Sequence, residues 1–429
     1  MRAIAGVGLT SIITPVGPAH ERFVQEAWQS LLAQRGERVR HWEWVLVANG
    51  GADLSRWADE PNVRVLEYDR PMEGGRASIG ALKRQGFEAA RGDVLVELDA
   101  DDLLTPWALD TIARAFEDPT VQFVYSNSAQ FEDGTWAPSS YSERYGWQSR
   151  PYRTAAGHEL IEMVAFPPTP HALRLIYWAP NHVRAWRAAA YRELEGHDSQ
   201  LWVGDDHDLV CRTYLRYGAR AMRHIDQCLY LYRIHGGNSC QVWNADVQRV
   251  TQSNYRRHIA AMAERWAKDT GLRMIDLGGR FRPAEGYEVW DLHGQVPVDL
   301  ERRWPARAGE VGILRAVDVV EHLADPIHTM NEAWRVLAPG GWFFIEVPST
   351  DGPGAWQDPT HKSYWNHNSF HYYTHEALAQ YIRPEFDGKF QLGWLETFES
   401  ELLAGRVPYV RAHLIAIKPG MERIPGEVC

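Results

Sequence analysis

The stretch that decides the fold is Gly92-Asp93-Val94-Leu95-Val96-Glu97-Leu98-Asp99-Ala100-Asp101-Asp102. A run of mostly apolar, strand-forming residues ends there in three carboxylates within four positions. Because a buried strand is a poor place for charge, we expect these carboxylates to emerge together at its carboxyl-terminal edge, where open α/β sheets bind ligands. The alternate spacing of Asp99 and Asp101 suits a divalent cation that holds a diphosphate. A solvated turn that opens a helix at Thr105-Pro106 is the other interpretation.

The composition is that of an ordinary soluble globular protein with room for two or three domains. Of 429 residues, 45% are hydrophobic and 24% are charged. The net charge of −11 shows no broad footprint for a nucleic-acid backbone, although it leaves a local basic groove open. The 19 Trp and 18 Tyr suit stacking surfaces for sugars or bases, and they suit packing equally well.

The cysteines and the hydropathy pattern point to a cytoplasmic protein. Four cysteines show neither a paired metal-ligand spacing nor a disulfide framework, which favours a reducing setting: Cys211, Cys228, Cys240 and Cys429. The N-terminus lacks the pattern of a secretory signal, and no apolar run approaches the ~20 residues that span a bilayer. We therefore expect no transmembrane segment, and the sequence leaves the oligomeric state open.

Strands and helices alternate at short spacing through the first part of the chain. The predicted strands are Leu9–Pro15, Trp42–Ala48, Val63–Glu67, Val94–Leu98 and Val121–Ser126. The predicted helices are Glu21–Gln34, Ile79–Ala90 and Pro106–Phe116. This alternation predicts a mostly parallel sheet that is covered on both faces.

Residues ~8–240 resemble an inverting family 2 glycosyltransferase of the GT-A fold. The parts that match, in the family's order, are Thr14-Pro15, the Asn49–Asp53 turn, the Gly74–Arg84 segment and the Leu98–Asp102 run. The resemblance implies that Thr14, Pro15 and Asp53 line the nucleotide pocket. It also implies that Asp99 and Asp101 address the nucleotide-sugar and its metal.

Two departures from the family pattern concern the donor side. Asn49-Gly50 stands where the second strand commonly ends in an acidic pair, which weakens the usual contact to the base. Lys83-Arg84 stands where many members have Arg-Asn. We expect cations at these positions to meet the donor diphosphate, with a solvated helix face as the alternative.

The segment Gly204-Asp205-Asp206-His207-Asp208-Leu209 begins a predicted helix that runs to Tyr217. Carboxylates at such a position are also ordinary helix caps. The segment stands where the family carries a Glu-Asp pair at the head of an acceptor-side helix. The resemblance therefore makes Asp206 the general base that deprotonates the acceptor hydroxyl, and direct displacement at the anomeric carbon needs such a base. Asp205 is its acidic neighbour, and Asp205 or Asp208 is the alternative base.

Two further segments complete the predicted site. His235 follows a strand-like Leu229–Tyr232 and precedes Gly236-Gly237, the arrangement by which the family brings a His to the metal; a structural role is the alternative. The stretch Tyr177–Arg187 interleaves aromatic and cationic residues, which suits an acceptor with rings, hydroxyls or phosphates. A core strand with an amphipathic edge is the other interpretation. The candidate acceptor contacts are Trp178, Asn181, His182 and Arg184.

A predicted amphipathic helix, Val242–Trp266, leads into a second α/β unit. Over residues ~270–415 this unit resembles a class I S-adenosylmethionine methyltransferase, most clearly at Glu321-His322-Leu323 and Arg335–Gly341. The resemblance implies cofactor contacts by Gly278 and Gly279 (methionine moiety), Asp291 (ribose hydroxyls) and Asp299 (near the adenine). The usual three spaced glycines are replaced by Gly278-Gly279-Arg280-Phe281-Arg282-Pro283, so a degenerate domain for assembly or acceptor docking is the alternative.

The segment from Gln357 to Tyr373 is rich in histidine and aromatic residues. Its His and Asp residues (Asp358, His361, His367 and His371) are of the types that bind a metal, but the spacing fits no standard site. We therefore expect a lid that is packed by its aromatic side chains.

The predicted fold class is α/β, with a GT-A nucleotide-sugar-binding domain (residues 1–241), a linker helix (242–269) and a Rossmann-like methyltransferase-type domain (270–429). The predicted function is a metal-dependent inverting glycosyltransferase in which Asp99, Asp101 and His235 hold Mn²⁺ or Mg²⁺. The donor is a nucleotide-sugar, with a UDP-sugar favoured. The acceptor hydroxyl belongs to a glycan or to a hydroxylated base in DNA. The alternative function is an S-adenosylmethionine-dependent methyltransferase that acts on a sugar or another small acceptor, with the first domain as a sugar-binding module.

Overall fold

The computed structural model describes residues 8–38, 41–68, 78–294, 296–400, 406–421 and 423–426. The chain divides into two compact units between residues 259 and 260, and residues 425 and 426 belong to the first. The division falls inside one long helix, α8 (Asn244–Thr270), which occupies the segment predicted as the linker. The predicted loop at 74–76 and Cys429 lie outside the described residues.

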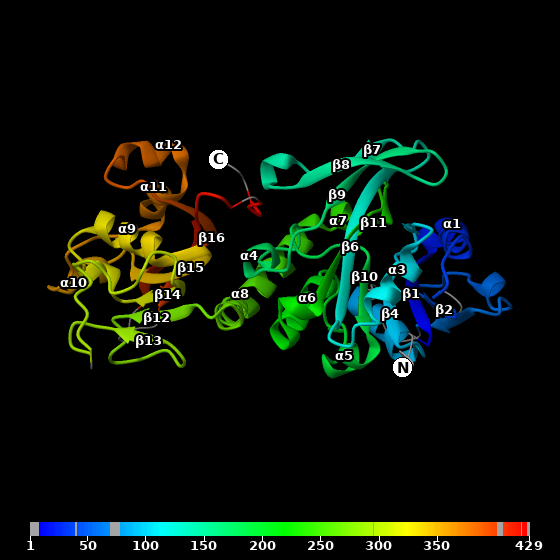
Figure 1. The fold of residues 1–429 in the computed structure, drawn as a ribbon, viewed down its shortest axis with the longest axis horizontal. Helices are drawn as coiled ribbons and strands as arrows, with labels where there is room; N and C mark the ends of the chain where they lie inside the picture. Colours follow the sequence, from blue (N-terminus) through cyan, green and yellow to red (C-terminus); the bar gives the residue numbers. More distant parts are fainter. Residues whose placement is uncertain are drawn as a thin grey trace, which may run out of the picture. The chain divides into compact units, whose positions relative to one another are not determined.

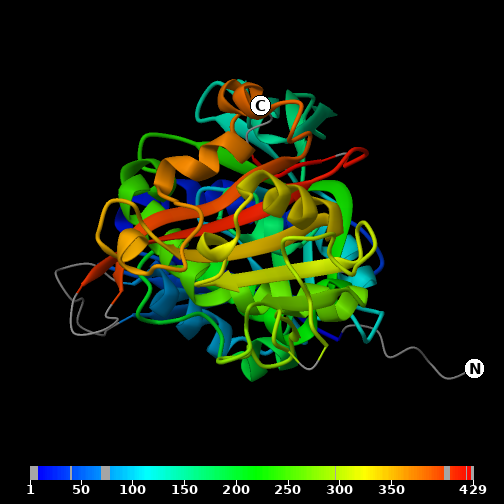
Figure 2. The same cartoon turned by 90° about the vertical axis from the view of Figure 1, so that its left-hand side faces the viewer.

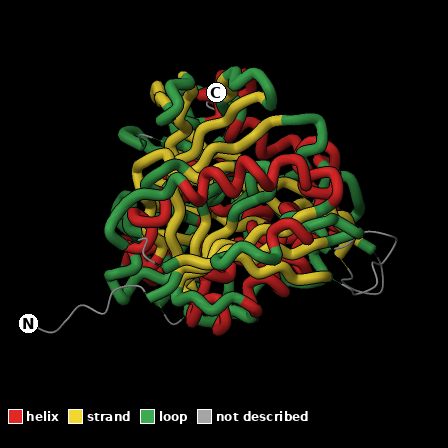
Figure 3. Tube along the Cα trace, turned by 90° about the vertical axis from the view of Figure 1, so that its right-hand side faces the viewer, coloured by secondary structure: helices red, strands yellow, loops and turns green. Residues whose placement is uncertain are grey.

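A mixed sheet forms the centre of the first unit, and Figures 1 and 3 show its strands side by side. The order along its main path is β3-β2-β1-β4-β10-β6-β11-β5. Their bounds are β1 (Thr10–Val16), β2 (Trp42–Ala48), β3 (Val63–Glu67), β4 (Val94–Glu97), β5 (Leu103–Leu104), β6 (Phe123–Glu132), β10 (Arg184–Arg187) and β11 (Met222–Ile234). The strands β7 (Pro138–Ser139), β8 (Gln148–Arg153) and β9 (Glu159–Val164) extend this sheet from β6 in antiparallel pairs.

The prediction of a mostly parallel sheet holds for β3, β2, β1 and β4 and for the pair β6 and β11, whereas the pairs made by β5, β7, β8, β9 and β10 are antiparallel. The strand β10 inserts between β4 and β6 and runs antiparallel to both. This strand follows β4 by more than eighty residues in the sequence. Short-range alternation of strands and helices therefore carries no information about where it pairs.

Helices cover both faces of this sheet. Helices α1 (Glu21–Leu32) and α3 (Ala108–Ala115) bury their apolar residues in one core cluster with Ile12, Trp44 and Val96. Helix α2 (Ile79–Ala89) lies on the opposite face, since a Cβ at Gly86 would stand 2.6 Å from a methyl group of Ile13. The remaining helices of this unit are α4 (Pro170–Leu173), α5 (Ala188–Glu193), α6 (Asp205–Tyr217) and α7 (Ser239–Val242).

Close packing of α2 positions one functional side chain. Besides its contact at Gly86, the helix approaches the chain at Gly80, where a Cβ would lie 2.1 Å from the carbonyl oxygen of Asp198. The absence of side chains at these two positions lets the helix lie directly on its neighbours. Lys83, between them, is consequently 5% exposed although it carries a charge.

The second unit contains a six-stranded sheet in the order β13-β12-β14-β15-β17-β16, which Figure 2 shows face-on. Its strands are β12 (Arg273–Leu277), β13 (Glu288–Trp290), β14 (Val311–Val317), β15 (Leu337–Pro348), β16 (Lys389–Ser400) and β17 (Val407–Ile417). Strands β13, β12, β14 and β15 are parallel, whereas β17 is antiparallel to both its neighbours. The segments that leave the parallel strands therefore meet at one edge.

Short helices and one longer helix complete the second unit. Helix α9 (Pro326–Val336) packs Met330, Ala333 and Val336 into the core of the sheet. The others are α10 (Gly354–Gln357), α11 (His371–Thr374) and α12 (Glu376–Ala379). Among the residues that the structure describes, none of the helices combines the length and the hydropathy needed to cross a lipid bilayer.

Candidate functional site

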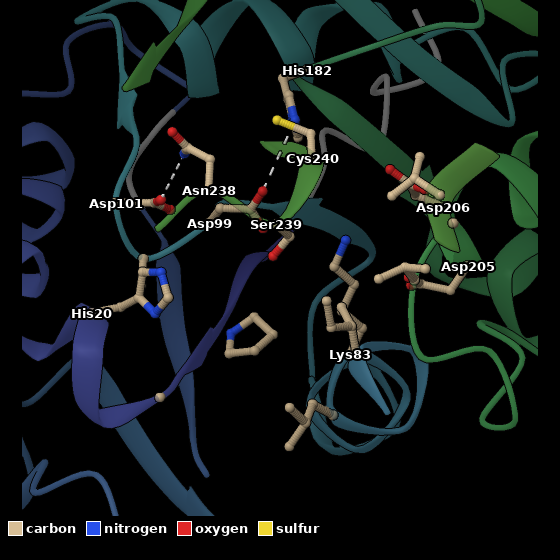
Figure 4. A pocket seen from close by; sticks show the side chains of 18 of the residues that line it. His20, Lys83, Asp99, Asp101, His182, Asp205, Asp206, Asn238, Ser239 and Cys240 are labelled. Carbon is tan, nitrogen blue, oxygen red and sulfur yellow. Dashed lines mark hydrogen bonds and ion pairs between the residues drawn. The ribbon is translucent and has the colours of Figure 1, made fainter. Parts of the chain in front are cut away.

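A cavity of about 350 Å³ lies in the first unit, at the carboxyl ends of β1 and β4 (Figure 4). Its lining comes from the segments after β1, β4 and β11, from α2 and β10, and from the beginning of α6. The charged and imidazole side chains that line it are His20, Lys83, Asp99, Asp101, His182, Arg184, Asp205 and Asp206. The volume is in the range of sites for small ligands and cofactors.

A buried carboxylate, Glu97, joins the cationic side chains of this site. Arg184 Nε donates to Glu97 Oε2 at 2.6 Å, and Lys83 Nζ lies 3.6 Å from Glu97 Oε1. His197 Nε2 lies 2.7 Å from the same Oε1. Although burial opposes ionisation, Arg184, Lys83 and His197 hold the pKa of Glu97 well below its usual value. The group is therefore an anion that connects β4, β10 and α2.

Lys83 lines the cavity as a buried cation. Burial opposes its charge, but the carboxylates of Glu97, Asp205 and Asp99 outweigh this effect and raise the pKa of Lys83 above its usual value. The interpretation as a solvated helix face therefore does not apply to Lys83. It applies to the next residue, since Arg84 pairs with Glu88 on the exposed side of α2 at 2.8 Å.

Two adjacent carboxyl groups at the beginning of α6 have opposite environments. Asp206 Oδ2 lies 2.8 Å from Arg184 Nη1. Burial opposes its charge, but Arg184 and Lys83 lower the pKa of Asp206 to about 2. Burial raises the pKa of Asp205, whose Oδ2 has no hydrogen-bond partner among the described residues. Figure 4 shows both groups on one side of the cavity, with Lys83 between them and Asp99.

The predicted metal ligands fall into two neighbouring groups. Asp101, His235 and His20 offer ligand atoms that lie within 4.8 Å of one another, and His235 Nε2 is 2.8 Å from Asp101 Oδ2. Asp99 instead groups with Asp102 and His182. The structure thus separates Asp99 from the pair Asp101 and His235, with which the prediction had combined it.

Sequence reasoning missed His20 as a member of the first group. The residue ends a short 3-10 helix (Pro18–His20) that directly follows β1. Its position just after the carboxyl end of a parallel strand was the available signal. Asp102 has a supporting role, because Tyr230 donates its hydroxyl hydrogen bond to this fully buried carboxylate at 2.8 Å and the backbone N–H of Arg233 donates another at 2.7 Å.

Only some of the residues predicted to contact the donor line the cavity. Pro15 and Asn49 are among its lining residues. Thr14 is fully buried, and its hydroxyl oxygen accepts a hydrogen bond from Trp44 Nε1 at 2.8 Å. Asp53 is exposed and accepts a hydrogen bond from the backbone N–H of Ser55. Thr14 and Asp53 are absent from the cavity lining.

The predicted acceptor contacts divide in the same way. His182 and Arg184 line the cavity. The ring of His182 stacks on Tyr230 at a centroid distance of 4.5 Å, and burial lowers its pKa to about 3, so that it is a neutral imidazole. Trp178 Nε1 donates to the carbonyl oxygen of Tyr145, and Asn181 Nδ2 donates to the hydroxyl of Tyr141. These two side chains lie outside the cavity lining.

In the second unit Gly278, Gly279 and Asp291 directly follow β12 and β13, and Asp299 lies in the segment between β13 and β14. A Cβ at Gly278 would stand 2.5 Å from a methyl carbon of Val319, and a Cβ at Gly279 would stand 2.2 Å from Asp276 Oδ2. The packing of the protein itself therefore requires both glycines. Asp291 and Asp299 are half-buried, and each accepts a hydrogen bond from a backbone N–H two residues later in the chain.

The Glu97 network predicts a pH-dependent loss of stability. Substitution of Glu97 by Gln leaves buried cations without their counter-ion, so we expect the free energy of unfolding at neutral pH to fall by roughly 3 kcal/mol. Because the pKa of Glu97 is lowered in the folded state, its contribution is complete above the ordinary value of 4.5 and declines as the pH falls below it. Urea denaturation of the wild type and of Glu97→Gln at several pH values measures this difference.

The matched control for this prediction is Glu88→Gln, on the exposed side of α2, which should change the free energy of unfolding little at any pH. A difference between wild type and Glu97→Gln that stayed constant down to strongly acidic pH would contradict the prediction.

Comparison with known proteins identifies both parts of the chain. Residues 11–175 match the family model described as glycosyl transferase family 2, and residues 248–383 match that of a methyltransferase domain. The O-antigen biosynthesis protein RfbC of Myxococcus xanthus is 27% identical over 267 residues, which cover 60% of this chain and 18% of RfbC. The protein EpsH of Bacillus subtilis (strain 168), which carries a glycosyltransferase name, is 22% identical over 221 residues, or 50% of this chain and 58% of EpsH.

A similarity to solved structures is weaker. The S. aureus TarS 1–349 structure in complex with UDP-GlcNAc has a TM-score of 0.42 and 13% sequence identity, and the match covers 64% of this chain and 76% of that one. The chain spans about a fifth of RfbC and just over half of EpsH. The two family models confirm the predicted pairing: the chain carries a glycosyl transferase family 2 domain followed by a methyltransferase domain.

Proposed function

We propose that the first unit is an inverting glycosyltransferase that moves a sugar from a nucleotide-sugar to an acceptor hydroxyl by single displacement. The observation that supports this proposal is the composition of one cavity. It combines Asp99 and Asp101 after β4, the buried cation Lys83 on α2, and the carboxylates Asp205 and Asp206 on α6. A leaving diphosphate needs positive charge, and an attacking hydroxyl needs a base on the other side of the reacting carbon.

The donor side of the cavity suits a divalent cation. Asp101, His235 and His20 supply one carboxylate and two imidazoles, and Asp99 lines the same cavity as Asp101. A set that contains two nitrogen ligands favours Mn²⁺ over Mg²⁺. When bound, such an ion would neutralise charge that develops on the leaving diphosphate. The ammonium group of Lys83 supplies a second positive charge in the same cavity.

We assign the role of general base to Asp206. The group is ionised at neutral pH, and its side chain is more accessible than that of Asp205, at 17% against 3% exposure. Arg184 orients the carboxylate through the 2.8 Å contact and also weakens it as a base. Proton transfer from the acceptor is then expected late, when the bond to the leaving diphosphate is largely broken. Asp205 lines the cavity, and its Oδ2 accepts no hydrogen bond among the described residues, although His197 Nε2 lies 3.8 Å away, so we assign it to accept a hydrogen bond from a sugar hydroxyl.

The acceptor is proposed to be a saccharide hydroxyl. The relative RfbC is named for O-antigen biosynthesis, so saccharides come first in an acceptor screen. A hydroxylated base in DNA is the second acceptor class to test. For the donor, a thermal-shift screen of nucleotide-sugars with Mn²⁺, UDP-sugars first, identifies the compound for the assays below.

Substitution of Asp206 by Asn should reduce sugar transfer by roughly 10²- to 10⁴-fold, because the acceptor hydroxyl loses its proton acceptor. The dissociation constant of the nucleotide-sugar should stay within a few-fold of the wild-type value. Steady-state kinetics and calorimetry measure these two quantities. The exposed Asp59→Asn is the control and should transfer at the wild-type rate. Wild-type turnover by Asp206→Asn would remove this residue from the mechanism.

Removal of divalent cations should abolish transfer, and Mn²⁺ should restore it more effectively than Mg²⁺. Asp101→Asn should weaken the activation by Mn²⁺ at least tenfold, because one of three ligand atoms loses its charge. A titration of activity against free Mn²⁺ after chelation gives the affinity. The exposed Asp59→Asn serves as the control. Full activity in the presence of excess chelator would show that the reaction proceeds without a cation.

A second proposal concerns the methyltransferase domain, for which the family match to residues 248–383 is the supporting observation. We propose that it binds S-adenosylmethionine with Asp291 on the ribose hydroxyls. Calorimetry on the full chain should show binding that Asp291→Asn weakens about tenfold, through loss of charge-assisted hydrogen bonds, and that the exposed Asp387→Asn leaves unchanged. Absence of binding heat would favour a degenerate domain, whereas binding without any nucleotide-sugar binding would favour a methyltransferase as the working enzyme.

A further inference from the structure

A second cluster of metal-ligating side chains lies in the methyltransferase domain. Glu321, His322 and His361 each offer a ligand atom, and these atoms lie within 4.8 Å of one another. The first two belong to a 3-10 helix (Val320–His322) at the carboxyl end of β14, and His361 follows α10. The 38 residues 323–360 lie between the two segments, so the sequence alone does not bring them together.

Glu321 is a buried carboxylate without a side-chain partner. The residue is 2% exposed, and no side chain among the described residues donates a hydrogen bond to its carboxylate oxygens, which lie near the backbone N–H groups of Val319 and of Glu321 itself. Its backbone carbonyl accepts hydrogen bonds from the N–H groups of Lys362 at 2.7 Å and Ser363 at 2.9 Å. These bonds hold the segment with His361 against Glu321. A buried carboxylate that no side-chain donor and no cation faces is costly, so a positive charge beside it would be stabilising.

Both imidazoles are oriented as they are in metal-binding histidines. His361 Nδ1 lies 2.8 Å from the carbonyl oxygen of Ala355. Because a carbonyl only accepts, Nδ1 carries the hydrogen and Nε2 keeps a free lone pair. His322 Nδ1 lies 3.1 Å from the hydroxyl oxygen of Thr360 and 3.3 Å from its carbonyl oxygen. Because the Thr360 hydroxyl donates to Asp358 Oδ1 at 2.6 Å, both oxygens are acceptors for Nδ1, which favours the same tautomer. Histidines that ligate metals typically donate their other N–H to a carbonyl or carboxylate in this way.

We propose that Glu321, His322 and His361 form a binding site for a divalent transition-metal ion in the methyltransferase domain. Two imidazoles and one carboxylate suit Zn²⁺, Co²⁺ or Mn²⁺ better than Mg²⁺ or Ca²⁺. Ligand atoms about 2.1 Å from one ion stand about 3.4 Å apart in tetrahedral geometry. Small side-chain rotations would bring the three ligand atoms from their present separations, within 4.8 Å, to this distance. Both imidazoles are half-buried, and three protein ligands leave a coordination position open for an oxygen ligand from solvent or substrate.

The position of the cluster relates it to the predicted cofactor residues. Val319, two residues before Glu321, is the side chain that a Cβ at Gly278 would meet at 2.5 Å. The cluster and the glycine pair therefore lie at the same edge of the parallel strands, the edge at which such sheets bind ligands. An oxygen ligand on the ion would stand at this edge.

The test is a titration of the full chain with Co²⁺, followed by visible absorption. It is performed in an Asp101→Asn/His235→Asn/His182→Asn background, so that neither cluster in the first unit can account for the signal. We expect one equivalent of Co²⁺ with d–d bands of imidazole coordination, displaced by Zn²⁺ but not by excess Mg²⁺. Glu321→Gln and His361→Asn should each weaken binding at least tenfold. His367→Asn, a histidine six residues further on and outside the cluster, is the matched control and should bind as the parent does.

Two results would overturn the proposal: no binding of Co²⁺ or Zn²⁺ in this background, or binding that neither Glu321→Gln nor His361→Asn weakens. Far-UV circular dichroism and the thermal midpoint establish that each variant is folded. Because His361 is half-buried and Glu321 is buried, His361→Asn decides the question if Glu321→Gln fails to fold. The spectroscopic signal does not depend on glycosyl transfer, so failure of the proposed function would leave this test intact.

Discussion

The ion cluster around Glu97 is the constraint on which the site of the first unit depends. This carboxylate ends β4 and binds Arg184 from β10 at 2.6 Å, and Lys83 from α2 lies 3.6 Å away. Arg184 continues to Asp206 at 2.8 Å. The cation proposed to face the donor and the carboxylate proposed to face the acceptor are thus held by one buried anion. None of these charges is tolerable alone at such depth, because burial of an unpaired charge costs several kcal/mol.

The same cluster shifts the pKa values of two neighbouring carboxyl groups, Asp205 and Asp206, in opposite directions. Arg184 and Lys83 outweigh burial at Asp206 and lower its pKa, whereas burial dominates at Asp205 and raises its pKa. Active sites commonly use such a pair of environments to give two carboxyl groups two roles. Here the difference supports an ionised Asp206 as base and Asp205 as a hydrogen-bonding group. Asp101, which also lines the cavity, lies close to two imidazoles from other segments, those of His20 and His235.

Each unit contains a buried carboxylate, and the two differ in the side chains that surround them. Glu97 is surrounded by Arg184, Lys83 and His197, all supplied by the chain. Burial raises the pKa of Glu321 to about 8, and within the described residues no side chain bonds to its oxygens. The imidazoles of His322 and His361 offer ligand atoms within 4.8 Å of its carboxylate. One metal ion would bind the carboxylate and both imidazoles together.

The sequence by itself determined the local features of this protein. Apolar runs and the alternation of strands and helices predicted the bounds of β1, β2, β3, α1 and α2 to within a few residues. The apolar run before Asp99 predicted the sheet edge at which the cavity lies. The order of motifs predicted the two domains that the family models match. Only the tertiary structure decided which segments meet. It inserted β10 antiparallel beside β4, turned Thr14 toward Trp44 while Pro15 faces the cavity, and brought His20 to Asp101 and His361 to Glu321. The physical reason is that secondary structure follows from neighbours along the chain. Sheet order and side-chain direction depend instead on packing between segments that are far apart in sequence.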